Sequence, residues 1–571
     1  MNEAQTATAA PRKGRASACG IALALLLAAL AFNQLRFLGT PLFWNDEGHT
    51  VMTGKFTLEY GYPRVTDGRN IVFADRIVDG VYQNFDPRLE ATTHSIWLAY
   101  YWAAFAVWLA RLADDPHTRT AIIRACFAAV GLLGIGLFWR GVAHRLRGTG
   151  DERAFGLGFL SLTLLSVSLV LHLREVRYYT LVFFEGGLLL YLYAHWRSEL
   201  PRMRLRWLAG LAGGLAATFL TFYPAYFIFG ATIAVIELGV LLAAITRPAP
   251  NQPFARRLRA GLVDGLRAGS PVGVSFLLVL PTFGYFEPFA KAGGELRWGE
   301  NLGILLTFLA RYEFLIPVAL TDGVVALLLI HAWRRGRLRA ALSDRRLSTA
   351  AALHAAFAVY AGVIARVPQP GYLFTRYFIP LIPIVSAAGV LELLWVRAWL
   401  REHAPTRPLG RLVAVLVVAS ALPYLGAKLD TWYGRILELR RPYRGPLDFA
   451  IPYLLDRFGD ETRNLVLATN YEEPVFMYYL DCKVTIGYRA NHVKDDLRYV
   501  PDVIVYRRWW GTHQQIFRRL LAAHRYEEIP FPVLDYPVNN IPQFEYPIPH
   551  QYQTQFSDDP EQRFTIYLRK D

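Results

Sequence analysis

Cysteine is scarce in this chain of 571 residues, which contains only Cys19, Cys126 and Cys482. The first two fall in apolar runs, and Cys482 alone falls in a polar C-terminal stretch. A disulfide framework or a thiolate metal centre needs several cysteines at short spacings, so the sequence predicts neither. We expect no metal and no cofactor.

A glycine-rich phosphate loop, an internal repeat and a low-complexity tract are also missing. The formal net charge is +15, but most arginines stand in short loops between apolar runs. A nucleic-acid binder would instead cluster its basic residues on one soluble surface. The charge therefore indicates cytoplasmic anchoring of membrane segments, and no nucleic-acid partner is expected.

Long apolar runs are what the chain has in abundance. Hydrophobic residues make up 54% of it and aromatic residues 14%, with a mean hydropathy of +0.23. Runs approaching the roughly 20 residues needed to cross a bilayer recur along most of the chain. The pattern predicts an α-helical polytopic membrane protein with about eleven transmembrane helices. The predicted crossings are residues 18–37, 121–139, 154–173, 180–196, 207–222, 225–246, 271–286, 313–333, 349–365, 378–396 and 412–427.

Residues 95–112 form a further apolar stretch, but we expect it to lie in the interface. If it crossed, the arginine-rich loop at 139–153 would be outside, against the usual charge bias. Its tryptophans and tyrosines also favour the headgroup level. An ordinary crossing that breaks the charge rule once remains the alternative. The first crossing is expected to be uncleaved with its N-terminus inside, although a cleaved signal is also possible.

The C-terminal part reads as a small α/β unit outside the membrane. We divide the chain into a membrane module, residues 1–428, and an exterior domain, residues 429–571. Strands are predicted at 464–470, 483–488, 502–508 and 563–569, and helices at 472–480 and 513–525. Residues 529–556, rich in Pro, Tyr and Asn, are expected to form an irregular loop.

The stretch FWNDEGHT, residues 43–50, directly follows the first crossing. Asp46 and Glu47 are adjacent there, with His49 two positions on. Carboxylates kept at the mouth of a membrane protein are costly to desolvate, so they are candidates for function. The alternative is a pair that only stabilises the first turn of a helix.

Basic residues of later exterior loops should face the same side of the membrane. Guanidinium groups bind phosphate oxygens with paired hydrogen bonds, and a nearby carboxylate can accept a proton from a hydroxyl. The alternative is that these side chains only anchor the ends of helices. The exterior basic candidates are Arg174, Arg177, Lys291, Arg297 and Arg376.

With this order of motifs the chain resembles the integral-membrane C-type glycosyltransferase superfamily (GT-C), in the branch of protein O-mannosyltransferases and aminoarabinose transferases. The matching elements are Asp46-Glu47 in the first exterior loop, the stretch Arg174–Tyr179, and Arg376-Tyr377 followed by Pro380 and Pro383. The sequence departs from the family in two places. Residues 85–90, FDPRLE, stand where a Lys-Pro-Pro element is expected in aminoarabinose transferases, and no Asp-x-Asp pair accompanies Arg174.

The resemblance implies transfer of one sugar, with inversion, from a polyprenyl-phosphate donor to a hydroxyl of a lipid, glycan or protein acceptor. It implies a multi-pass protein of the bacterial cytoplasmic membrane whose site faces the periplasm. Asp46 and Glu47 would then be catalytic, and Arg174, Arg177, Tyr178, Arg376 and Tyr377 would bind the donor phosphate. His49, Lys291 and Arg297 would serve the acceptor side.

Two other functions remain open at this point. A transporter or flippase of an amphipathic lipid would use ionisable residues within its spans, and Glu185 and Glu237 are such residues. A non-catalytic assembly subunit would use the C-terminal domain to bind a partner.

Overall fold

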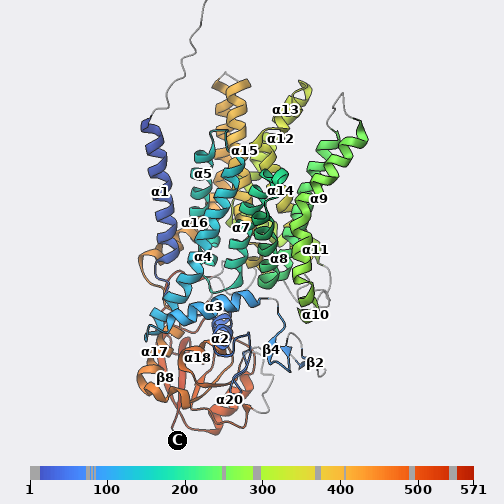
Figure 1. The fold of residues 1–571 in the computed structure, drawn as a ribbon. Helices are drawn as coiled ribbons and strands as arrows, with labels where there is room; N and C mark the ends of the chain where they lie inside the picture. The colour runs from blue at the N-terminus through green and yellow to red at the C-terminus, as the bar shows by residue number, and fades with distance from the viewer. Residues whose placement is uncertain are drawn as a thin grey trace, which may run out of the picture.

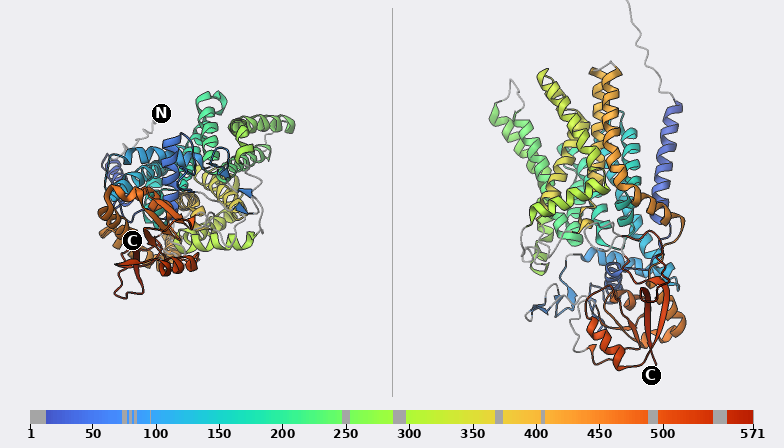
Figure 2. Two further views of the ribbon diagram at one scale, coloured as in Figure 1. Left: turned by 90° about the horizontal axis from the view of Figure 1, so that it is seen from below. Right: turned by 180° about the vertical axis from the view of Figure 1, so that it is seen from behind.

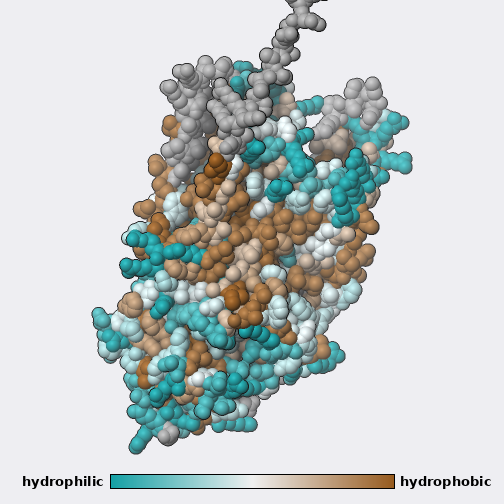
Figure 3. Space-filling model, turned by 60° about the vertical axis from the view of Figure 1, so that its left-hand side comes forward, coloured by the Kyte–Doolittle hydropathy of each residue, from teal (hydrophilic) through white to brown (hydrophobic). Residues whose placement is uncertain are grey.

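The computed structural model describes residues 13–72, 77–78, 81–82, 85–94, 96–246, 253–286, 297–366, 374–403, 407–487, 496–538 and 550–570. Helices run along one axis and form a bundle, and a smaller unit with a β-sheet covers one end of it (Figure 1). An apolar surface extends over the bundle, whereas polar residues dominate the surface of the smaller unit (Figure 3). The predicted class, a helical membrane protein with a small C-terminal α/β unit, is confirmed.

The bundle helices overlap the predicted crossings, although their bounds differ at several places. They are α1 (Lys13–Leu35), α4 (Pro116–Arg145), α5 (Glu152–Leu165), α6 (Val167–Leu173), α7 (Tyr178–Ser198), α8 (Leu205–Thr246), α9 (Phe254–Val279), α10 (Phe283–Phe286), α12 (Leu315–Arg334), α14 (Arg345–Ile364), α15 (Leu381–His403) and α16 (Arg407–Arg440). By length and composition, seven helical segments of the described chain could cross a membrane, or eight if the bent pair α5–α6 is one span.

Helix α8 holds two of the predicted crossings. Its 42 residues are about twice what a bilayer requires, and Phe222 interrupts it with non-helical backbone. Gly210 and Gly214 in its first half lie against Leu192 and Leu189 of α7, an antiparallel order. In its second half Phe229 lies against Gly186, and Glu237 accepts a hydrogen bond from Tyr193, a parallel order. The chain therefore turns back at Phe222, beside the expected turn at Tyr223 and Pro224.

Two helices of the loop that follows α1, which was predicted to be exterior, lie beneath the bundle. These are α2 (Asn45–Tyr60) and α3 (Trp97–Ala110), and α3 lies across the end of the bundle rather than along its axis (Figures 1 and 2). The orientation agrees with an interfacial position for residues 95–112. Short hairpins pair β1 (Ile77–Val78) with β2 (Val81–Tyr82) and β3 (Phe85–Asp86) with β4 (Ala91–Thr92).

The loops at the opposite end of the bundle are arginine-rich. Arg346, at the start of α14, pairs with Asp151 before α5 at 2.6 Å, and Arg345 donates to the carbonyl of Arg147. The short helix α13 (Leu338–Leu342) lies at this same end (Figure 1). The basic loops thus gather at the end opposite α2, as charge-biased anchoring requires.

The C-terminal unit is built on a five-stranded sheet in the order β6-β5-β7-β9-β8. Strands β5 (Val466–Thr469), β6 (Lys483–Ile486) and β7 (Val503–Val505) are parallel, and β9 (Arg563–Arg569) runs antiparallel beside β7. Its helices are α17 (Leu447–Phe458), α18 (Glu473–Leu480) and α20 (Gln514–Ala523). The predicted boundary at 428/429 falls inside α16, which continues into this unit.

Several elements of the fold were not predicted. Residues 526–534 form the edge strand β8 (Tyr526–Leu534), although 529–556 were expected to be irregular throughout. Pro530 and Pro532 fit there because an edge strand leaves some backbone positions without a ladder hydrogen bond. Helix α17 and helix α11 (Trp298–Tyr312) also lie in stretches for which no element was expected.

Candidate active site between the bundle and the sheet unit

Helix α2 carries the paired acids. It begins at Asn45, and the backbone N–H of Trp44 donates to Glu47 at 3.5 Å, which closes the first turn. The helix is wedged between α3 and α18, and Gly48 permits this packing. A Cβ atom at Gly48 would stand 2.6 Å from Cγ2 of Val475, far inside van der Waals contact. A small residue is therefore required two positions after Asp46.

Asp46 lies between two arginines. Its Oδ2 atom is 2.7 Å from Nη1 of Arg376 and 3.4 Å from Nη2 of Arg177. Arg177 Nη1 also donates to the backbone carbonyl of Asp46 and to Thr50 Oγ1, at 3.0 and 3.2 Å. Burial by itself would raise the pKa of Asp46, but Arg177 and Arg376 outweigh it and lower the pKa to about 2. The carboxyl is therefore ionised at neutral pH.

Three separate segments converge here. Asp46 comes from α2, Arg177 from the turn before α7, and Arg376 from the short helix η3 (Thr375–Phe378) before α15. One carboxylate faces two guanidiniums, which leaves one positive charge in excess. The Nε atoms of both arginines are buried without a hydrogen-bond partner in the described part of the chain. The site is thus suited to an additional anion.

An aromatic wall adjoins the two arginines. The ring of Tyr178 lies 4.2 Å from that of Tyr179 and 5.1 Å from that of Phe222. Tyr377 meets Tyr179 edge-on at 6.1 Å and stacks on Phe222 at the same distance. The guanidinium of Arg177 lies 5.4 Å from the ring centre of Tyr178. Charge and apolar surface therefore meet at the start of α7 and the bend of α8.

Glu47 occupies a different environment from its neighbour. It is fully buried, and its two oxygens accept from Nε of Arg124 at 2.9 Å and from Nη2 of the same guanidinium. The backbone N–H of Val176 also donates to it, at 3.1 Å. With the N–H of Trp44, four donors fill its acceptor positions. These contacts tie α2 to the turn bearing Arg177. They leave the carboxylate of Glu47 no open acceptor position, so its catalytic role stays a prediction that this arrangement does not favour.

Arg124 was not predicted to belong to the site, because it lies in the apolar run of α4. It is 2% exposed and also donates from Nη1 to the carbonyls of Leu38 and Pro41. An arginine inside an apolar run is itself a signal of a specific partner, because burying an unpaired charge is costly.

Among the described residues, Arg174 makes no contact with Asp46. Its Nη2 donates to the carbonyl of Arg36 at 2.9 Å, and its charged neighbours include Arg435 and Glu438 of α16. Burial, and then Arg435, lowers its pKa to about 9. The phosphate-binding role expected for Arg174 therefore has no geometric support at Asp46, although Arg177 lies only three positions away.

The three residues expected on the acceptor side differ in how they relate to Asp46. His49 lies close enough to Asp46 to contribute to lowering its pKa. Arg297 is half exposed at the start of α11 and pairs with Glu300 at 3.6 Å, so it does not reach the Asp46 cluster in the described chain. Lys291 lies outside the described residues.

Tyr100 of α3 is a second residue that the sequence did not single out. It is 1% exposed, and its hydroxyl has no hydrogen-bond partner among the described residues. Burial raises the pKa of this hydroxyl, and Arg177 and Asp46 are the charges that act on it. Tyr100 therefore contributes a buried neutral hydroxyl within electrostatic range of Asp46 and Arg177. Its position among interfacial aromatics concealed it in the sequence.

Comparison with known proteins gives structural matches only. No family model and no curated protein matches the chain. The fold is similar to apo ArnT from Cupriavidus metallidurans, with 14% identity over 97% of this chain and 98% of that chain, at a TM-score of 0.42. It is equally similar to the same protein bound to undecaprenyl phosphate, with 14% identity, 98% coverage of each chain and a TM-score of 0.42.

An oligosaccharyltransferase from Archaeoglobus fulgidus, in its apo form, is also similar. The identity is 13% over 82% of this chain and 65% of that chain, with a TM-score of 0.46. At these values the similarities support no conclusion about chemistry, which must come from the residues of the site.

Proposed function

We propose that this chain is a membrane glycosyltransferase that moves one sugar from a polyprenyl-phosphate carrier to a hydroxyl acceptor. The observation that carries the proposal is the placement of Asp46 between Arg177 and Arg376. A carboxylate that can accept a proton and two guanidiniums that can bind a phosphate stand within one cluster.

The donor phosphate is held by Arg177 and Arg376 in this proposal. The excess positive charge and the buried, unpaired Nε atoms of both arginines support it. The aromatic wall formed by Tyr178, Tyr179, Phe222 and Tyr377 offers apolar surface next to the charged head. Such a neighbourhood suits a ligand with an anionic head and a hydrocarbon tail.

Asp46 receives the proton of the acceptor hydroxyl. With a pKa of about 2 it is a weak base while both arginines point at it. A bound phosphate competes for the same guanidinium hydrogens, which weakens their hold on Asp46 and raises its basicity. Donor binding thereby makes Asp46 a better proton acceptor.

The chemical step is a single displacement. The acceptor oxygen forms a bond to the anomeric carbon, its proton passes to Asp46, and the bond from that carbon to the phosphate oxygen breaks. The electron pair leaves with the polyprenyl phosphate, whose charge Arg177 and Arg376 stabilise. One displacement inverts the anomeric carbon. We infer that the hydroxyl of Tyr100, on which Asp46 and Arg177 act electrostatically, donates its hydrogen to a group bound at this site.

The site is assigned to the outer face of the bacterial cytoplasmic membrane. The support is the gathering of arginine-rich loops at the end of the bundle opposite α2 (Figure 1). The acceptor class, whether lipid, glycan or protein, stays open in the proposal.

The transporter alternative gains little from the structure. Glu185 accepts a hydrogen bond from Thr221 within α8, and Glu237 is bonded to Tyr193 and lies 3.4 Å from Arg197. Glu237 therefore has a cationic partner inside the bundle, whereas Glu185 is bonded to a neutral hydroxyl, so the transporter alternative rests on Glu185 alone.

The test is sugar transfer by the purified chain in bilayers, supplied with polyprenyl-phosphate sugars and an extract of cell-envelope acceptors. Wild type should release free polyprenyl phosphate together with a glycosylated product. Asp46→Asn should lose about 10²-fold to 10⁴-fold of that rate. Glu59→Gln, an exposed acid of the same helix, is the matched control and should keep it. Unchanged transfer by Asp46→Asn would remove the proposed base.

A further inference from the structure

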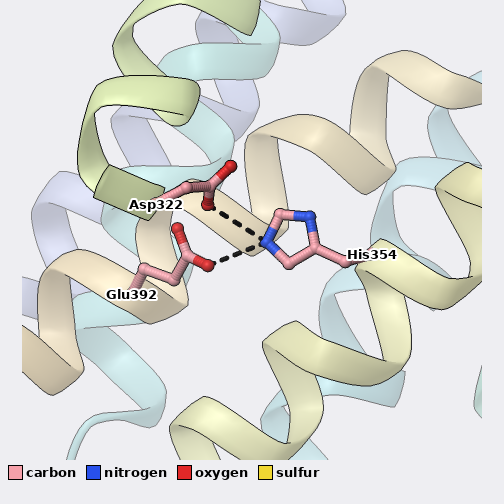
Figure 4. A group of neighbouring side chains, drawn as sticks. All are labelled: Asp322, His354 and Glu392. Atoms are coloured by element: carbon pink, nitrogen blue, oxygen red, sulfur yellow. Dashed lines mark hydrogen bonds and ion pairs between the residues drawn. The ribbon is translucent and has the colours of Figure 1, made fainter. Parts of the chain in front are cut away.

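Three ionisable side chains meet inside the helical bundle, away from Asp46. They are Asp322 of α12, His354 of α14 and Glu392 of α15, each near the middle of its helix. Figure 4 shows both carboxylates directed at the same imidazole nitrogen. Nε2 of His354 lies 2.8 Å from Oε1 of Glu392 and 3.3 Å from Oδ1 of Asp322.

We propose that Asp322, His354 and Glu392 bind a first-row transition-metal dication of the zinc type, which ties α12, α14 and α15 together. This is the group of His, Cys, Asp and Glu side chains in the described chain whose ligand atoms could hold a metal ion. The proposal does not depend on the function assigned to Asp46.

The geometry fits a small dication. All three ligand atoms lie within 4.8 Å of one another. Ligands bound to zinc at their usual bond lengths in a tetrahedral arrangement stand about 3.3 Å apart, so shifts of less than about 1 Å would close the site. An imidazole nitrogen with two carboxylates favours zinc, manganese or iron over calcium and magnesium, which prefer oxygen ligands.

The charge balance points the same way. Two carboxylates and a neutral imidazole carry two negative charges in the middle of spanning helices, where net charge is costly. A dication neutralises them completely, whereas protonating the imidazole alone leaves one negative charge. Glu392 is 3% exposed and its Oε2 atom is buried without a hydrogen-bond partner among the described residues. That oxygen is available as a ligand.

The position of the three side chains determines how exposed the group is and which helix a bound metal would fix. The side chains of His354 and Asp322 are 37% and 42% exposed, so the group lies at the surface of the bundle and is not sealed among the helices. Helix α15 begins three residues after η3, which carries Arg376. A metal bound by this group would therefore fix α15, the helix that follows Arg376.

The experiment measures metal bound to the full chain in detergent. The protein is stripped with a chelator, equilibrated with Zn²⁺ in the presence of millimolar Mg²⁺ and Ca²⁺, freed of excess ion and analysed for zinc per chain. Wild type should retain about one zinc ion and melt at a higher temperature with zinc than without. His354→Gln and Asp322→Asn should lose both the ion and the shift.

His331→Gln is the matched control, because His331 lies on the same helix as Asp322 and packs against Trp399 outside the group. It should retain zinc like wild type. Asp322→Asn preserves size at a half-exposed position, so it decides the matter if His354→Gln fails to fold. Zinc retained equally by wild type and both ligand variants, no zinc in wild type, or displacement by Mg²⁺ would overturn the proposal.

Discussion

Arg376 donates from Nη1 to Oδ2 of Asp46 over 2.7 Å, although 330 positions of sequence separate the two residues. Asp46 stands in α2, shortly after α1, and Arg376 stands in η3, just before α15. Since they come from opposite ends of the membrane module, the contact requires the bundle to be assembled. This pair joins a group that can accept a proton to a group that can bind an anion, so changes at either residue should alter transfer.

Replacing either arginine by lysine should weaken donor binding more than it slows turnover. Lysine keeps the charge but loses the planar fork that gives paired hydrogen bonds to a phosphate. We expect Arg376→Lys and Arg177→Lys to raise KM for the polyprenyl-phosphate sugar roughly tenfold. Arg297→Lys, at a half-exposed position outside the cluster, should leave KM unchanged. Steady-state kinetics in bilayers measure KM and turnover separately for each variant. Equal effects of all three substitutions on KM would contradict the prediction.

Glu47→Gln should destabilise the chain rather than remove a catalytic group. The substitution leaves the guanidinium of Arg124 buried without its counter-charge, which typically costs about 3–5 kcal/mol. Thermal melting should therefore fall in Glu47→Gln, and the double variant Glu47→Leu/Arg124→Met should recover part of the loss. A variant that melts like wild type and yet loses transfer would restore Glu47 to the catalytic role.

Gly48→Ala should disturb the site through packing. The added methyl meets Cγ2 of Val475 in α18, and overpacking of this kind costs roughly 1–3 kcal/mol. Because Gly48 lies two positions after Asp46, transfer should fall along with the melting temperature. Val475→Ala removes the nearest atom, but the backbone nitrogen of Val475 would still lie 3.0 Å from the added methyl, so Gly48→Ala/Val475→Ala should recover part of both. Failure of the double variant to recover either would mean that the contact does not govern the site.

The ionised state of Asp46 should make part of the stability acid-sensitive. Its pKa is lowered to about 2 in the folded chain, below the ordinary value near 4 of an unfolded aspartate. The ion pair therefore stabilises the fold fully above about pH 4, and this contribution disappears as the pH falls towards 2. The difference in melting temperature between wild type and Asp46→Asn should shrink over that interval. A difference that is constant from pH 2 to pH 7 would contradict the lowered pKa.

Much of the helical architecture was predictable because each crossing is a long apolar run bounded by arginines. The pairing of Asp46 with Arg177 and Arg376 followed from topology, since exterior loops must share one side of the membrane. The sequence did not predict that Arg174 and Arg177 would contact different partners. The chain turns between α6 and α7, so two arginines three positions apart reach different partners, Arg36 in one case and Asp46 in the other.

Other features were hidden for definable reasons. Arg124 and Tyr100 look like minor members of apolar helices until the fold shows what they face. Asp322, His354 and Glu392 come from three helices and are separated by 32 and 38 positions, so no short motif joins them and no metal site was expected. Strand β8 was concealed by its prolines, which are tolerated only because it is an edge strand.

The most direct test of the shared site compares donor binding with transfer in one variant. Asp46→Asn removes the carboxylate that competes for Arg177 and Arg376, so polyprenyl phosphate should bind the purified variant as tightly as wild type or more tightly. Sugar transfer by the same preparation should fall by about 10²-fold or more. Weaker binding of polyprenyl phosphate by Asp46→Asn, or transfer at the wild-type rate, would contradict the account.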